Sequence, residues 1–149
     1  MSLKEKIYVH CLQILNAKIT EMQKDLNDLT EGAKNDAKSS AGDKYESTSS
    51  VIALEKEKIG IQLKEAMEQK KILENININV NSKHIIKGSL VKTDKALLFI
   101  AIALGKIYVD DKSIMVISSA SPLGIKLMGL KQNDSARING LEYFIEEIG

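Results

Sequence analysis

The residues best suited to chemistry are two carboxylates, Asp43 and Glu46, in the segment Gly42-Asp43-Lys44-Tyr45-Glu46. Residues three positions apart lie on the same face of a helix, and carboxylate oxygens are the ligands that a hard cation such as magnesium prefers. The pair also has a structural interpretation, because Asp43 as an N-cap and Glu46 three residues later form a capping box. The motif alone favours helix initiation and leaves a cation-binding role open.

Residue combinations typical of enzymes are absent from the rest of the sequence. His10 and Cys11 are neighbours, so on a helix their side chains point about 100° apart and form no local catalytic pair. These two residues and His84 are interpreted as structural. Ser121 precedes Pro122 and is interpreted as a helix cap rather than a nucleophile. The sequence contains no glycine-rich phosphate-binding loop, and one cysteine cannot build a disulfide framework or a cysteine zinc site.

The composition is that of a globular protein, and it excludes several classes of function. The formal net charge of the 149 residues is +1, and Arg137 is the single arginine, so neither a strongly basic surface nor guanidinium readout of nucleic acid is expected. The N-terminus lacks a secretory apolar core. The longest apolar run, Ala96 to Leu104, is about half of a membrane span. We expect a cytoplasmic chain, a monomer, that does not enter membranes.

Two long helices should position the carboxylate pair. The first is predicted from Leu3 to about Lys38 and the second from about Tyr45 to Glu74, with turn-forming residues at 39–43. The second helix carries a broader apolar stripe, which Lys56 and Lys70 interrupt. Its central positions are Ile52, Ile59, Leu63, Ala66 and Leu73, with Val51, Leu54 and Ile61 beside them. The first has apolar residues at alternating spacings of three and four, as in a coiled-coil seam: Leu12, Leu15, Ile19, Met22, Leu26 and Leu29.

The short connection favours an antiparallel hairpin over residues 1–75, with its acidic tip near residues 39–46. Each apolar seam would then find its partner in the same molecule. A parallel coiled coil between two molecules is the alternative.

The sequence changes character near residues 75–82, where β-branched residues and glycines replace the helix formers. We predict a linker at 76–82 and a β domain at 83–149. Asn139-Gly140 is typical of a type I′ hairpin turn, and Ser121, Pro122 and Gly129 bound one short helix. The expected strands are Ile85–Val91, Ala96–Leu104, Lys106–Val109, Ser113–Ser118, Ser135–Ile138 and Leu141–Ile148. The expected core residues are Leu97, Phe99, Ile107, Ile114, Val116, Leu127, Ile138 and Ile145.

The predicted fold class is therefore α+β, with an antiparallel two-helix coiled coil followed by an antiparallel sheet and one short helix. This layout resembles the bacterial transcript-cleavage factors of the GreA/GreB type. Gly42, Asp43 and Glu46 match the acidic tip of that family, whereas Ser47 and Ser50 replace its usual asparagine and aromatic residue. Further matches lie in the family's FKBP-like domain: Gly88-Ser89-Leu90-Val91, Ile114 to Ser119, Ser121-Pro122-Leu123, Leu127-Met128-Gly129, and the closing hairpin from Asn139-Gly140 to Ile148.

The resemblance implies that the β domain docks at the secondary channel of RNA polymerase while the coiled coil enters it. Asp43 and Glu46 would help to hold a second magnesium ion in the polymerase, which cleaves the 3′ end of backtracked RNA. The free protein is expected to bind no metal and to be no enzyme itself. Lys34, Lys38 and Lys44 are candidates for RNA contact, although solvation of the helices is the simpler interpretation.

Two other functions stay open at this stage. Relatives of the family enter the same channel and regulate transcription without promoting cleavage. Alternatively, the chain is a coiled-coil adaptor or chaperone whose β domain binds peptides. With no tryptophan and only Phe99 and Phe144, an aromatic-lined proline pocket is hard to build.

Overall fold

The computed structural model describes the backbone of residues 1–39 and 43–149 and the side chains of residues 1–32 and 49–149. Its contacts divide the chain into two compact units. The sheet unit comprises Met1–Gln13 with Lys71–Gly149, and the hairpin unit comprises Ile14–Lys70. The elements are α1 (Leu3–Ser39), α2 (Asp43–Glu74), β1 (Leu90–Thr93), β2 (Leu97–Ala101), β3 (Gly105–Val109), β4 (Lys112–Ser118), α3 (Pro122–Leu127), β5 (Ser135–Ile138) and β6 (Leu141–Ile148).

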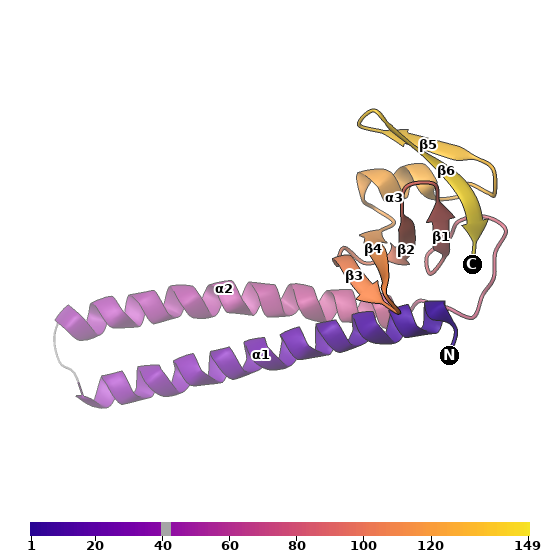
Figure 1. Ribbon diagram of the computed structural model, residues 1–149. Coiled ribbons are helices and arrows are strands. Elements are labelled where there is room, and N and C mark those ends of the chain that lie inside the picture. The colour runs from indigo at the N-terminus through magenta and orange to yellow at the C-terminus, as the bar shows by residue number, and fades with distance from the viewer. Residues whose placement is uncertain (40–42) are drawn as a thin grey trace. The chain divides into compact units, whose positions relative to one another are not determined.

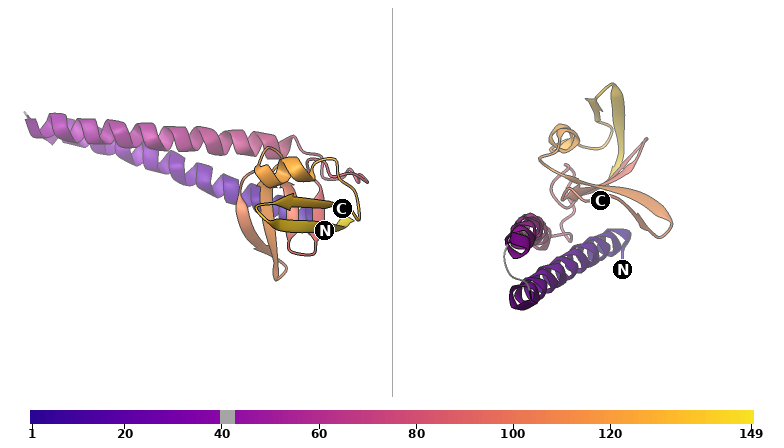
Figure 2. Two further views of the ribbon diagram at one scale, coloured as in Figure 1. Left: turned by 90° about the horizontal axis from the view of Figure 1, so that it is seen from above. Right: turned by 90° about the vertical axis from the view of Figure 1, so that its left-hand side faces the viewer.

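Helices α1 and α2 pack side by side and run in opposite directions (Figure 1; Figure 2). The observed bounds lie within two residues of the predicted ones. Only three residues, 40–42, separate the two helices. The predicted α+β class and the helix pair are therefore confirmed, while residues 40–42 of the predicted turn lie outside the described residues.

Burial along the hairpin unit confirms the apolar seam of α1. Leu15 and Ile19 are buried, and the later seam residues are half-buried. The seam of α2 is narrower than predicted, because Val51, Leu54 and Ile61 are exposed. Six of the half-buried or buried positions of α2 follow the three-and-four spacing of a coiled coil: Ile52, Lys56, Ile59, Leu63, Ala66 and Lys70.

A lysine at a seam position should limit the stability of the hairpin. We expect Lys56→Leu to raise the free energy of unfolding by about 1 kcal/mol, because leucine buries apolar surface where the ammonium group must reach for water. Lys58→Leu is the matched control, since Lys58 is exposed and leucine there gains no partner. Urea unfolding followed by circular dichroism measures both changes. Equal effects of the two substitutions would contradict the assignment of the seam.

The six strands form one sheet in the order β3-β4-β2-β1-β6-β5. The sheet is mixed, which corrects the prediction of a purely antiparallel sheet. β2 pairs with β4 in parallel, from Leu97 beside Ile114 to Ala101 beside Ser118, whereas the other pairs are antiparallel. After β2 the chain skips one strand position through residues 102–104 and runs back as β3, at the outer edge of the sheet. β4 then fills the position between β3 and β2, and it runs in the same direction as β2.

Both faces of β2 are buried from Leu98 to Ala101, and the sheet shares its unit with the ends of the two helices. One face contributes to a core that includes Leu98 and Ile100 of β2 and Leu127 of α3. Phe99 points to the other face and is also fully buried. In the same unit the helices contribute the fully buried residues Ile7, Cys11 and Leu73. We infer that the start of α1 and the end of α2 complete the core of the sheet unit.

Local turn chemistry agrees with the sequence at two positions. Asn139 and Gly140 both have positive φ, at 51° and 80°, as a type I′ turn requires. The hydroxyl oxygen of Ser121 accepts a hydrogen bond from the Gly124 amide at 3.0 Å, and Pro122 occupies the first helical position. Gly129, with a φ of +84°, follows the end of α3. The predicted cap, helix and hairpin are confirmed.

Some strand and core assignments are wrong. The strand predicted at Ile85–Val91 begins only at Leu90, because Gly88 takes a φ of +93° and packs against the side chain of Ile76. Ile138 is half-buried, and Ala136 fills the inward position of β5 instead. The core also includes residues that the sequence analysis did not name: Ile85, Val91, Leu98 and Ile100.

Candidate functional site

The acidic tip is placed by the ends of the two helices. Asp43, Lys44 and Glu46 occupy the first turn of α2, and Lys34 and Lys38 occupy the last turns of α1. The side chains of all five residues lie outside the described part of the structure, as does the backbone of Gly42. The helical backbone puts Asp43 and Glu46 at positions i and i+3, which share one face of α2.

Two carboxylates on one helix face are fewer ligands than magnesium requires. The ion prefers six oxygen ligands, and proteins commonly supply one or two carboxylates while water and substrate phosphates supply the rest. Asp43 and Glu46 therefore suit a shared site, in which a second molecule contributes ligands. The helix segments of the hairpin unit are about 40 Å long at 1.5 Å per residue, and Asp43 and Glu46 belong to the end of α2 that follows the connection.

Ser121 and Cys11, which were also considered for chemistry, have surroundings typical of structural residues. Ser121 both accepts the Gly124 amide hydrogen bond and donates its hydroxyl to the Ser118 carbonyl at 2.7 Å, as expected for a cap. Cys11 is fully buried, and burial raises the pKa of its thiol to about 11, so little thiolate exists at neutral pH. Among the described residues, no cluster of three or more histidine, cysteine, aspartate or glutamate side chains could hold a metal ion.

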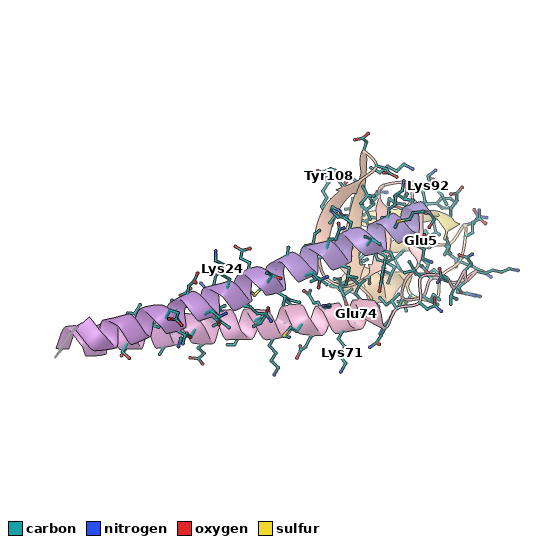
Figure 3. All side chains as sticks on the ribbon, turned by 90° about the horizontal axis from the view of Figure 1, so that it is seen from below. Glu5, Lys24, Lys71, Glu74, Lys92 and Tyr108 are labelled. Carbon is teal, nitrogen blue, oxygen red and sulfur yellow. The ribbon has the colours of Figure 1, made fainter. Side chains whose placement is uncertain are left out.

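A groove in the sheet unit is a feature that the sequence analysis missed. It has a volume of about 670 Å³, and its lining includes Leu3, Leu90, Lys92, Leu97 and Lys112. Figure 3 shows Lys92 extending from the sheet. The lysines stand far apart in the sequence, and the parallel pairing of β2 with β4 brings them to one end of the sheet. A pattern read along the chain gives no sign of this convergence.

The β1–β2 connection borders this groove and is fixed by an aspartate. The carboxylate of Asp94 accepts a hydrogen bond from the Phe144 amide at 2.8 Å and lies 3.3 Å from the ammonium group of Lys95. The hydrogen bond from the Phe144 amide lowers the pKa of the Asp94 carboxyl below its ordinary value. The hydrogen bond from Lys95 and the positive charge of its ammonium group lower this pKa further. Lys95 also donates to the Glu142 carbonyl, so the connection is joined to β6.

Comparison of the chain with models of protein families, with curated proteins and with solved structures gives no match. In the part of the chain that the structure describes, no helix is long and apolar enough to cross a membrane. The functional assignment therefore depends on the residues and the geometry described above.

Proposed function

We propose that this chain binds RNA polymerase through its secondary channel and stimulates the polymerase to cleave backtracked RNA. The observation that carries the proposal is the antiparallel helix pair with two carboxylates, Asp43 and Glu46, in the first turn after its connection. The sheet unit would dock on the polymerase. The resemblance of the tip and of the Ser121-Pro122 segment to transcript-cleavage factors supports the same assignment.

The chemistry would come from a magnesium ion shared between this chain and the polymerase. When bound, a second metal stabilises the attacking and leaving oxygens of a phosphodiester and lowers the pKa of its bound water. Asp43 and Glu46 would supply two of its ligands, and the hairpin would carry them into a narrow channel. Lys34, Lys38 and Lys44 would lie close enough in the helices to meet the phosphates of the RNA.

A cleavage assay tests the proposal. Bacterial RNA polymerase is stalled in a backtracked complex with end-labelled RNA, and the chain is added with magnesium. We expect the transcript to shorten faster than with polymerase alone, and Asp43→Asn combined with Glu46→Gln to return the rate to that of polymerase alone.

The matched control is Asp28→Asn combined with Glu31→Gln, which removes two exposed carboxylates with the same spacing from α1. This variant should retain full stimulation. If the wild-type chain binds polymerase and leaves the RNA intact, it is a channel-occupying regulator and the cleavage proposal is wrong. If it does not bind polymerase, both polymerase functions are wrong and the peptide-binding adaptor becomes the better hypothesis.

A further inference from the structure

A second groove of the sheet unit is polar, and two segments that lie far apart in the sequence form most of it. Its volume is about 470 Å³, and small-molecule sites commonly measure about 300–1,000 Å³. We call it the polar groove, and six residues line it: Asn81, Ser82, Lys83, Lys131, Gln132 and Ile148. Ile148 is the single apolar residue among these six, so the groove suits a ligand rich in polar groups.

Backbone hydrogen bonds fix the two lysine-bearing segments next to each other. His84 and Lys131 pair in an antiparallel bridge. The Ile85 amide donates to the Leu130 carbonyl at 2.7 Å, and the Gly129 amide donates to the Ile85 carbonyl at 2.8 Å. The segments that carry the lysines are therefore joined to each other in the folded unit, which reduces the ordering that a ligand must impose.

The described lining of the polar groove carries positive charge alone. Lys83 and Lys131 contribute two ammonium groups, and no carboxylate belongs to this lining. Both lysines are exposed, and neither forms an ion pair with any residue whose side chain the structure describes. An anion that enters the groove would therefore meet two charges without a partner.

Three acidic residues adjoin the groove in the sequence, and each is engaged in another contact. Asp134 accepts a hydrogen bond from the Lys131 amide at 2.9 Å. The carboxylate of Glu146 lies 3.9 Å from the ammonium group of Lys92. Glu147 lines the other groove of the unit. These carboxylates thus leave the two ammonium groups of the polar groove unpaired.

We propose that the polar groove binds the phosphate monoester group of a small phosphorylated molecule. Such a group carries about −1.5 to −2 charge at pH 7 and three strong acceptor oxygens, so two ammonium groups balance it. Ser82 and Asn81 would add neutral donors. The Ser82 oxygen already accepts the His84 amide at 3.1 Å, which leaves the hydroxyl hydrogen for the ligand. The proposal goes beyond the cleavage function and does not involve Asp43 or Glu46.

Macromolecular phosphates fit the polar groove less well. A phosphodiester of nucleic acid carries one negative charge, which two ammonium groups exceed. Single-stranded nucleic acids also bind through stacking on aromatic side chains, and the described lining contains none. A phosphorylated peptide would need apolar contacts beyond its phosphate, and Ile148 alone offers one.

A titration of the isotope-labelled full-length chain with methyl phosphate, followed by nuclear magnetic resonance, tests the proposal. Ionic strength is held constant, because salt screens exposed charges. We expect saturable shifts of the amides of residues 81–84 and 131–132. Dimethyl phosphate is the matched probe, since it is a diester with a single charge. Its affinity should be about tenfold lower, because it loses the pairing of one exposed charge.

Two double variants locate the site. Lys83→Gln combined with Lys131→Gln should abolish the saturable shifts. The matched control is Lys112→Gln combined with Lys126→Gln, which removes two exposed lysines outside the groove and should retain binding. The proposal is overturned if methyl phosphate leaves these amides unshifted, if both double variants lose binding equally, or if dimethyl phosphate binds as tightly as methyl phosphate. Circular dichroism of each variant ensures that a loss of binding is not a loss of fold.

Discussion

Leu73→Ala is expected to lower the free energy of unfolding of the sheet unit by about 2–5 kcal/mol, as for other buried leucines. Leu73 belongs to the last turns of α2 and is fully buried within the unit that contains the sheet. Its removal should leave a cavity between the helix end and strands that lie far away in the sequence. The measurement is hydrogen exchange of amides in the β2–β4 pair, such as those of Phe99 and Val116.

Ile72→Ala is the matched control for this prediction. Ile72 precedes Leu73 in the same helix, but 46% of its surface is exposed, so truncation removes little buried area. We expect a loss below about 1 kcal/mol there. If Leu73→Ala accelerated exchange in α2 and left the β2–β4 amides protected, the helix end would not belong to the core of the sheet unit.

Gly124→Ala should destabilise the sheet unit by about 2–3 kcal/mol, from overpacking and the loss of a helix cap. A Cβ atom at Gly124 would lie 2.1 Å from the carbonyl oxygen of Ser118 and 2.9 Å from the hydroxyl oxygen of Ser121. The first of these is a backbone atom that cannot rotate away. Helix α3 must therefore shift, and with it Leu127, which is fully buried in the core. Thermal unfolding in the near-ultraviolet measures the loss.

The control for Gly124→Ala is Gly60→Ala. Gly60 lies inside α2, and no atom would approach an added Cβ within 4 Å. Alanine should stabilise that helix by about 0.5–1 kcal/mol, because it restricts the unfolded chain and favours helix. The same substitution thus has opposite signs at the two positions. A stabilising Gly124→Ala would show that the contact with Ser118 does not constrain α3.

Elements with a local cause could be predicted from the sequence. The coiled-coil seam follows from residues three and four apart, and β5 and β6 match their predicted bounds because Asn139-Gly140 determines the turn between them. The parallel pairing of β2 with β4 was missed because it joins strands that are not consecutive. Residue patterns carry no local sign of such a pairing. The sequence also gives no sign that Leu73 belongs to the unit that contains the sheet, since the helical pattern of α2 continues through this residue without interruption.

The candidate sites differ in the same way. Asp43 and Glu46 could be proposed from the sequence because both belong to one helical turn. Residues three positions apart in a helix lie on the same face. The groove could not be proposed from the sequence, because Leu3, Lys92 and Lys112 come from three elements that only the folded sheet unit brings together. The cap at Ser121 was predictable, since its partner Gly124 is three residues away.

The proposed cleavage function requires that α1 and α2 fold back on each other within one molecule. Spin labels at Lys24→Cys and Lys58→Cys test this directly. Both positions are exposed, Lys24 points away from the helix pair in Figure 3, and each lies 15 residues from the helix end at the connection. The native Cys11 is buried, and its raised pKa of about 11 keeps it unlabelled.

Packed helices have axes about 8–10 Å apart. The two labels should therefore give a short distance by pulsed electron paramagnetic resonance, and dilution with unlabelled protein should not change it. A single continuous helix would instead separate the labels by about 51 Å, from its rise of 1.5 Å per residue. That long distance, or a short one that disappears on dilution, would contradict the hairpin and with it the proposed delivery of Asp43 and Glu46 to the polymerase.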